Sequence, residues 1–220
     1  MIRRALLAFF VLAASPGLAA RYDFGVLNGE LKDPRPGEIR IVFIGDSITS
    51  GWISPLPDKV DGAVRIGRGI AGQTSAQVRA RFAADAIALH PAIVHILVGT
   101  NDIAGNGGPM TLDDTRANLT AMASAAQAAG IRVIIGTLLP TIDYGWRPGQ
   151  HPVPKIAEMN AWIRQEAAAR HYVLAEYFTP LAAPDGSLKA QLSSDGVHPN
   201  ASGYKLVEKI ATTAIAEARK

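Results

Sequence analysis

Five apolar runs separated by helical patterns constrain the fold more than any other feature of this sequence. Each predicted strand is apolar along most of its length instead of alternating with polar residues, which indicates strands buried on both faces. Strands that alternate with helices in this way predict a parallel sheet covered by helices on both faces. The strands are predicted at 39–44, 63–66, 93–98, 132–137 and 172–175, and the helices at 77–88, 111–129, 155–170 and 201–218.

The N-terminus has the three-part organisation of a secretory signal peptide. Paired arginines precede an apolar run at 5–14, and a Ser-Pro-Gly break leads into small residues that suit cleavage after Ala19 or Ala20. The apolar run is short for a retained membrane anchor. We therefore expect residues 1–20 to be a signal peptide and residues 21–220 to be one domain that is exported, either to the periplasm or out of the cell.

Cysteine content limits how the exported chain can be stabilised, and net charge limits which partners it can bind through electrostatic attraction. The chain has no cysteine, so its stability after export cannot come from disulfides. Two of its 22 Lys and Arg lie in the predicted signal, which leaves 20 against 19 Asp and Glu, a net charge of +1. This balance gives no electrostatic argument for nucleic acid or an anionic membrane as a partner. No segment after the signal has the length and hydropathy of a membrane span.

Glycines and polar residues gather directly after the predicted strands. Gly45-Asp46-Ser47 follows the first strand, "GIAGQTS" follows the second and "GTND" follows the third. Taken singly, each segment is explained by a turn or a helix cap. Ligands of open parallel sheets, however, bind beyond the carboxyl ends of the strands. The sequence therefore predicts that these segments meet at one site.

A further segment, "DGVHPN", supplies an acid and an imidazole. Asp195 and His198 are three residues apart before the last helix, and a carboxylate on one ring nitrogen raises the basicity of the other. A hydroxyl nucleophile needs such a base, and Ser47 is the candidate. Acyl transfer also needs hydrogen-bond donors for the oxyanion. The candidates are the backbone N–H groups of Ser47 and Gly72 and the side-chain amide of Asn101, although a loop glycine and an Asx turn would each explain the last two when taken alone.

In their order along the chain, "GDS", "GIAGQTS", "GTND" and "DGVHPN" resemble the four sequence blocks of the SGNH hydrolases, also called GDSL esterases. The resemblance covers nearly all of residues 21–220, and Ile48 replaces the leucine that names the family. It implies a three-layer α/β/α, flavodoxin-like fold with a five-stranded parallel sheet in the order 2-1-3-4-5, and ester hydrolysis without metal or cofactor. The family's signature residues fall on Ser47, Gly72, Asn101 and His198, and the third triad member falls on Asp195.

Two other kinds of site are weaker interpretations of the same segments. "GRGIAG", at 67–72, matches the dinucleotide-binding G-x-G-x-x-G, but it follows the second strand. Asp85 lies at roughly the offset of the ribose-binding acid but within a helical pattern, and Asp102 is too far. Asp195 and His198 could bind a metal, but a catalytic zinc needs about three protein ligands and the other histidines are scattered. Asp46 and Asp102 are expected to brace their loops through hydrogen bonds to backbone amides.

The substrate is the least constrained prediction. Tyr144 and Trp146, in the loop after the fourth strand, and Trp52 are predicted to rim the site, although ordinary loop packing would also explain them. The compact chain has no lid, which favours short acyl groups, and acetyl esters of a carbohydrate are the expected substrates. The alternatives are a lysophospholipase, a general short-chain acylhydrolase and a glycan-binding module without catalysis.

Overall fold

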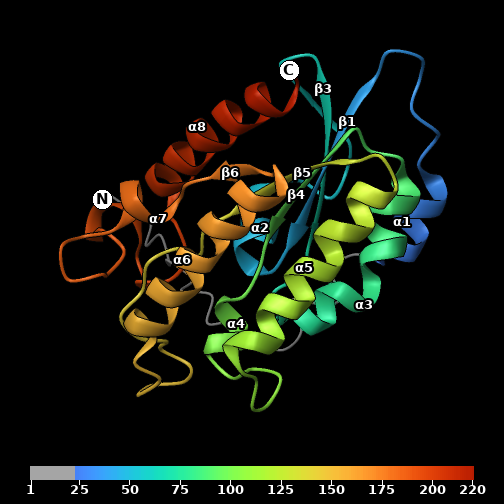
Figure 1. Ribbon diagram of the computed structural model, residues 1–220. Coiled ribbons are helices and arrows are strands. Elements are labelled where there is room, and N and C mark those ends of the chain that lie inside the picture. Colours follow the sequence, from blue (N-terminus) through green and yellow to red (C-terminus); the bar gives the residue numbers. More distant parts are fainter. Residues whose placement is uncertain (1–22) are drawn as a thin grey trace, which may run out of the picture.

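The computed structural model describes residues 23–220, so the predicted signal peptide at 1–20 lies outside the described residues. Its centre is a six-stranded sheet in the order β2-β3-β1-β4-β5-β6 (Figure 1). Five of these strands are parallel, and their order is the predicted 2-1-3-4-5. The strands are β1 (Ile39–Gly45), β2 (Asp58–Val60), β3 (Ala63–Gly69), β4 (Ile93–Leu97), β5 (Arg132–Gly136) and β6 (Val173–Ala175).

The sixth strand, β2, corrects the prediction of five. It runs antiparallel to β3 at the edge of the sheet, with Val60 paired to Ala63 across a two-residue turn. Asp61 and Gly62 form that turn with φ values of 50° and 76°. Left-handed conformations at both positions are what a tight hairpin requires, and Asp-Gly is a common pair for it. The prediction missed β2 because the strand is three residues long and largely polar.

Helices cover both faces of the sheet (Figure 1). The long helices α3, α5 and α6 pack on one face, where they meet side chains such as Val42, Ile96 and Ile135. Helix α8 covers the other face with the short α2 and α7, against side chains such as Phe43 and Ile134. The helices are α1 (Phe24–Glu30), α2 (Ser47–Trp52), α3 (Ser75–Asp85), α4 (Thr100–Ile103), α5 (Leu112–Ala128), α6 (Pro152–Arg170), α7 (Phe178–Leu181) and α8 (Ala201–Ala218), with single 3-10 turns at Ile87–Leu89 and Ala190–Leu192.

Capping residues set the ends of the long helices. Thr111 caps α5 and forms a capping box with Asp114, close to the predicted start. Helix α3 begins two residues before the prediction, because Thr74 forms a capping box with Gln77. No helix among residues 23–220 combines the length and hydropathy needed to cross a bilayer.

The topology brings the predicted site segments together. Strand β1 pairs with β3 on one side and β4 on the other, so the loops that follow these three strands leave the same edge of the sheet. Ser47 begins α2 directly after β1, Gly72 lies in the loop after β3, and Asn101 lies in α4 after β4. The loop that leads into α8 carries Asp195 and His198.

Candidate active site

A serine, a histidine and an aspartate form a continuous hydrogen-bonded series. The Ser47 hydroxyl oxygen lies 2.9 Å from His198 Nε2, and His198 Nδ1 lies 2.7 Å from Asp195 Oδ2. Ser47 is separated from His198 by 151 residues, so the contact depends on α2 and the loop before α8 meeting at one edge of the sheet. The bond to Asp195 directs Nε2 of the ring toward the hydroxyl, which is the orientation that a general base for Ser47 needs.

The loop that carries the acid and the imidazole is held by its own hydrogen bonds. Asp195 Oδ1 accepts from the backbone N–H groups of Val197 and His198 at 2.9 and 2.7 Å. The Ser193 hydroxyl donates to the carbonyl of His198 and accepts from the N–H of Gly196. Partial burial raises the pKa of Asp195, but the hydrogen bonds from His198 and Val197 outweigh it and lower the pKa below its ordinary value. The carboxylate therefore stays ionised beside the ring at neutral pH.

Asp46 braces the start of α2. Its Oδ1 accepts from the backbone N–H of Ile48 at 3.0 Å, which caps the helix that begins at Ser47. The predicted bracing role is thereby confirmed. The side chain is fully buried, and burial raises its pKa from 3.8 to about 7, although the Ile48 N–H and the charge of His198 lower it. Asp46 is thus poised to change its charge close to neutral pH.

Asp102 braces the next loop in the same way. It accepts hydrogen bonds from the backbone N–H of Ser75 at 2.9 Å and from the hydroxyls of Ser75 and Thr115. Burial raises the pKa of Asp102, and these hydrogen bonds lower it in part. The carboxyl group therefore ties α4 to the first turn of α3 and to α5, as the sequence predicts.

The predicted oxyanion donors lie in adjoining segments. Asn101 is 2 % exposed, and its Nδ2 donates to the carbonyl of Gln73 at 3.0 Å and approaches Asp46 Oδ2 at 3.4 Å. Gly72 precedes Gln73 and has a φ of 79°, a left-handed conformation that glycine adopts without steric cost. The Asn101 amide thus bridges the loops after β1 and β3, beside two of the predicted donors.

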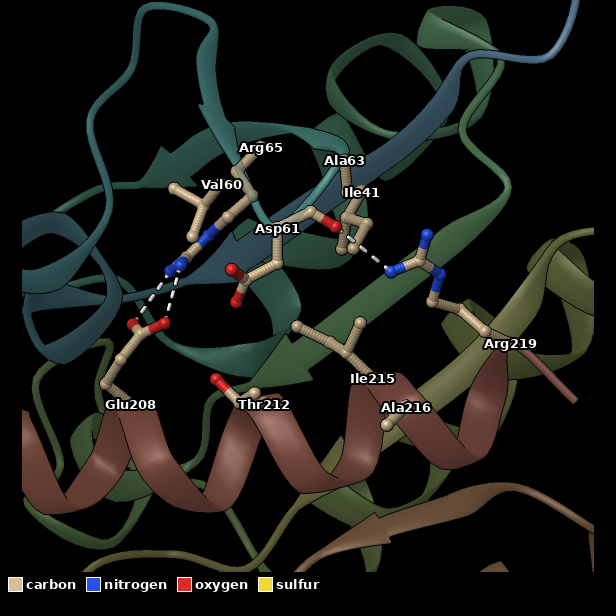
Figure 2. Close-up of a pocket in the computed structure, with 10 residues that line it drawn as sticks. All are labelled: Ile41, Val60, Asp61, Ala63, Arg65, Glu208, Thr212, Ile215, Ala216 and Arg219. Carbon is tan, nitrogen blue, oxygen red and sulfur yellow. Dashed lines mark hydrogen bonds and ion pairs between the residues drawn. The ribbon is translucent and has the colours of Figure 1, made fainter.

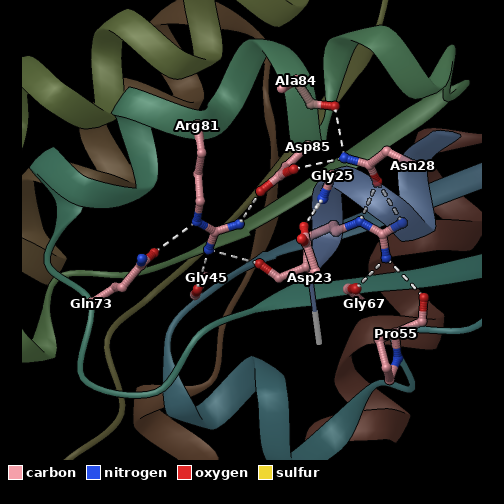
Figure 3. A network of polar contacts seen from close by, with 11 residues as sticks. Asp23, Gly25, Asn28, Gly45, Pro55, Gly67, Gln73, Arg81, Ala84 and Asp85 are labelled. Atoms are coloured by element: carbon pink, nitrogen blue, oxygen red, sulfur yellow. Dashed lines mark hydrogen bonds and ion pairs between the residues drawn. The ribbon is translucent and has the colours of Figure 1, made fainter. Parts of the chain in front are cut away.

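Arg81 links these loops through hydrogen bonds (Figure 3). Its guanidinium donates to the carbonyls of Gly45 and Arg68 at the ends of β1 and β3, at 3.0 and 2.9 Å. It also donates to the side chain of Gln73 at 2.7 Å and pairs with Asp85 at 2.9 Å. One planar donor group therefore links two strand ends to the Gln73 loop.

The aromatic residues predicted at the rim fall in different places. Trp146 is 43 % exposed, and its ring centroid lies 6.1 Å from that of His198. Tyr144 is fully buried beneath it, with ring centroids 5.3 Å apart and its hydroxyl 3.2 Å from that of Thr100. The prediction of Tyr144 as a rim residue is therefore wrong, because the loop turns this ring into the core as a support for Trp146.

Trp52 packs on the α8 face of the sheet. Its ring meets those of Phe43 and His95 edge-on at 5.2 and 5.7 Å, and its Nε1 donates to Glu208 at 2.7 Å. Glu208 also accepts from both terminal nitrogens of Arg65, and this ion pair lines a pocket between the β2–β3 hairpin and α8 (Figure 2). These contacts account for Trp52, and its place at the rim stays a prediction.

The first two glycines of "GRGIAG", Gly67 and Gly69, have a packing role. A Cβ atom on Gly69 would meet the backbone of Ser50 and Asp46, so glycine at this position lets β3 approach α2. Packing therefore explains these two glycines without a bound dinucleotide. Among residues 23–220, no three His, Cys, Asp or Glu side chains come together as a metal site would require.

Sequence reasoning missed Asn106. Its Nδ2 donates to Asn101 Oδ1 at 2.6 Å, and its Oδ1 accepts from Trp146 Nε1 at 2.9 Å. The only local signal is an Asn-Gly pair, which is typical of a turn. Its contact with Trp146, 40 residues away, could not be read from the sequence.

Comparison with known proteins agrees with this geometry. The strand order and the hydrogen-bonded Ser47, His198 and Asp195 are those that the resemblance to the SGNH hydrolases implies. A family model matches residues 43–206, and the chain belongs to the GDSL-like lipase/acylhydrolase family. The protein is a carboxylic ester hydrolase. No curated protein matches the chain.

Solved structures extend the similarity to the whole described domain. A GDSL-like lipase from Bacteroides thetaiotaomicron is 40 % identical, with a TM-score of 0.83 over 89 % of this chain and 96 % of its own. A candidate acylhydrolase from Bacteroides fragilis is 38 % identical, with a TM-score of 0.85 over 94 % of this chain and 100 % of its own. A catalytic mutant of Axe2, an acetylxylan esterase from Geobacillus stearothermophilus, shares the fold at 19 % identity, with a TM-score of 0.65 over 80 % of this chain and 94 % of its own.

Proposed function

We propose that the protein is a serine esterase in which Ser47, His198 and Asp195 form the catalytic triad. The observation that carries this proposal is the unbroken series of hydrogen bonds from the Ser47 hydroxyl through the His198 ring to Asp195. His198 Nε2 takes the hydroxyl proton as Ser47 Oγ attacks the ester carbonyl. Asp195 holds the ring and stabilises the imidazolium that forms.

The tetrahedral intermediate is stabilised by the backbone N–H groups of Ser47 and Gly72 and by the amide of Asn101. His198 then protonates the leaving alcohol, and an acyl group remains on Ser47. Water repeats the sequence, with His198 again as the base, and releases the acid. Each step uses a proton that the same ring nitrogen accepts and returns.

The test is Ser47→Ala with p-nitrophenyl acetate as substrate. We expect turnover to fall close to the uncatalysed rate while the melting temperature stays near that of the wild type. Unchanged turnover in this variant would refute the proposal. Labelling by a fluorophosphonate distinguishes the esterase from a glycan-binding module, because only an activated serine reacts.

For the substrate, we propose acetyl or other short acyl esters on a carbohydrate. Trp146 supports this choice, because its half-exposed ring lies beside His198, where the leaving alcohol receives its proton. An aromatic face of this kind can pack against a sugar ring. Axe2 acts on acetylated xylan, but its similarity to this chain is one of fold.

A chain-length series of p-nitrophenyl esters tests the acyl preference. An acyl pocket gains roughly 0.8 kcal/mol per buried methylene, so a lysophospholipase would show kcat/KM rising steeply from acetyl to octanoyl. We expect the highest kcat/KM at acetyl or propionyl, together with acetate release from acetylated xylan. A short-chain preference without release from any acetylated glycan would favour the general acylhydrolase.

We also propose that residues 1–20 are removed on export. Mass spectrometry of the exported protein should find an N-terminus at Ala20 or Arg21. An intact Met1 on the exported protein would contradict this.

A further inference from the structure

Asn106 connects an exposed aromatic ring to a buried amide of the site. Trp146 Nε1 donates to Asn106 Oδ1 at 2.9 Å, and Asn106 Nδ2 donates to Asn101 Oδ1 at 2.6 Å. Asn101 Nδ2 in turn donates to the carbonyl of Gln73 at 3.0 Å. These three hydrogen bonds run from a ring beside His198 to the loop that contains Gly72.

The direction of every hydrogen bond in this series is fixed by its first member. An indole nitrogen can only donate, so the oxygen of the Asn106 amide must face Trp146. The amide nitrogen of Asn106 then faces Asn101, where it needs an acceptor, and Asn101 Oδ1 is that acceptor. Asn101 is left with its two N–H groups on the side of Gln73 and Asp46, where its contact to Asp46 Oδ2 is long, at 3.4 Å.

We propose that Asn106 is a positioning residue that holds the Asn101 amide with its donors toward the oxyanion, and that Trp146 sets the orientation of Asn106. This inference rests on the proposed function, in which Asn101 stabilises the oxyanion. Oxyanion donors are effective because they are oriented before the reaction. A free Asn101 amide would spend part of its time with its oxygen toward the developing negative charge.

Through the same hydrogen bonds, the alcohol part of the substrate can affect how the oxyanion is stabilised. Trp146 lies on the side from which the alcohol leaves, with its ring tilted by 31° to that of His198. An alcohol with a flat ring face that packs on Trp146 restricts the indole and, through Asn106, the Asn101 amide. Binding energy from a group that does not react is thereby used in the transition state, so that a ring alcohol raises kcat as well as lowering KM.

The decisive experiment is a pair of double-mutant cycles measured with p-nitrophenyl acetate and with ethyl acetate, which lacks a ring. We expect Asn106→Ala to lower kcat about tenfold on ethyl acetate, because loss of a whole oxyanion donor costs about 10²- to 10³-fold. The loss should be larger on p-nitrophenyl acetate, whose ring acts through Trp146 and Asn106. In an Asn101→Ala background, Asn106→Ala should cause no further loss, since it acts through Asn101. If Asn106→Ala lowers kcat by the same factor in the Asn101→Ala background as in the wild type, the inference is overturned.

Trp146→Phe keeps the ring and removes only the indole N–H. We expect it to lower kcat a few-fold in the wild type and not at all in Asn106→Ala. Trp162→Phe is the control, because it removes an indole N–H from a side chain of α6 that packs against the core and does not belong to this series. An equal loss of kcat in Trp162→Phe would show that the effect does not depend on the Asn106 series.

Asn106→Asp guards against a folding defect, because it is nearly isosteric and still accepts from Trp146 but cannot donate to Asn101. We expect its kcat to be as low as that of Asn106→Ala, with an unchanged melting temperature. If Asn101→Ala is itself fully active, the proposed oxyanion hole fails. If Asn101→Ala is impaired while both Asn106 variants have wild-type kcat, only the present inference fails.

Discussion

Trp52 and Trp146 both follow strands of the central sheet, but they belong to two different kinds of polar environment. Trp146 lies at the active-site edge, half exposed, and its hydrogen bond leads through Asn106 to Asn101. Trp52 lies under α8, where its hydrogen bond leads to the Glu208–Arg65 ion pair. The first environment is a series of hydrogen bonds that connects an exposed ring to the proposed oxyanion loop. The second is an ion pair that lines a pocket between the β2–β3 hairpin and α8.

The contrast indicates where substitutions should act. Around Ser47, the polar groups form the proposed active site, so changes there should lower activity more than stability. Around Trp52, the ion pair and the hydrogen bond between His95 Nε2 and the Tyr177 hydroxyl, at 2.7 Å, satisfy buried groups. Changes there should lower stability more than activity.

The largest effect is expected at His198. His198→Ala removes the base and should lower kcat by roughly 10⁴-fold or more, with a melting temperature near that of the wild type. Asp195→Asn should lower kcat at least about tenfold less, because a poorly oriented base still accepts a proton. The measurement is steady-state hydrolysis of p-nitrophenyl acetate beside thermal unfolding. An equal or larger loss in Asp195→Asn would contradict this order.

The two regions should also respond to pH in opposite directions. Burial raises the pKa of Asp46 to about 7, so the folded state holds its proton more tightly than the unfolded state does. The protonated carboxyl group of Asp46 therefore contributes to the free energy of unfolding at about pH 4, and this contribution is lost as the pH rises through 7. Asp46→Asn stays neutral, so its stability relative to the wild type should increase from pH 4 to 7, by on the order of 3 kcal/mol. A constant difference across this range in urea unfolding would refute the prediction.

His95, in the Trp52 region, is the counterpart. Burial, helped by the charge of Arg65, lowers the pKa of His95 from 6.5 to about 3, so the unfolded state takes up the proton first. The stability gained from the neutral ring is present above pH 6.5 and is lost as the pH falls. His95→Gln should therefore become more stable relative to the wild type from pH 6.5 to 4, by on the order of 3 kcal/mol. A difference that stays flat over this interval would argue against a neutral buried ring.

Glu208→Gln tests the ion pair under α8. It leaves the Arg65 guanidinium, whose side chain is 9 % exposed, without a charged partner. We expect a loss of about 2 kcal/mol of unfolding free energy, with kcat within about twofold of the wild type. Glu158→Gln is the control, because its exposed pair with Arg116 should contribute less than about 1 kcal/mol. A larger loss in the control would show that burial does not set the difference.

The smallest and sharpest test exchanges each tryptophan for phenylalanine. Trp52→Phe should lower the unfolding free energy by about 1 kcal/mol, the usual net contribution of one hydrogen bond, and leave kcat unchanged. Trp146→Phe should change the unfolding free energy by less than about 0.5 kcal/mol, as exposed substitutions usually do, and lower kcat a few-fold. The opposite assignment of the two effects would contradict this difference between the two regions.

The amino-acid pattern predicted the parallel sheet and the catalytic constellation, and the resemblance to the SGNH hydrolases implied the five-strand order. Apolar runs such as 39–44 are long enough to predict strands without tertiary information, because a nearly continuous run of apolar side chains is expected to be buried. Ser47, Asn101 and His198 could be named because each lies in a short motif beside a strand or helix end. The short β2 was missed although Asp61-Gly62 marks its turn, since a polar edge strand has no hydrophobic pattern.

Only the tertiary structure decided what each aromatic ring contacts. Tyr144 and Trp146 are two residues apart, yet one is fully buried and the other 43 % exposed. Their environments come from Thr100, Asn106 and His198, each of which lies 40 or more residues away in the sequence. Local sequence carries the propensity to form a strand or a turn. Partners distant in the sequence determine whether a side chain in a loop becomes core, support or binding surface, because only the folded chain brings them together.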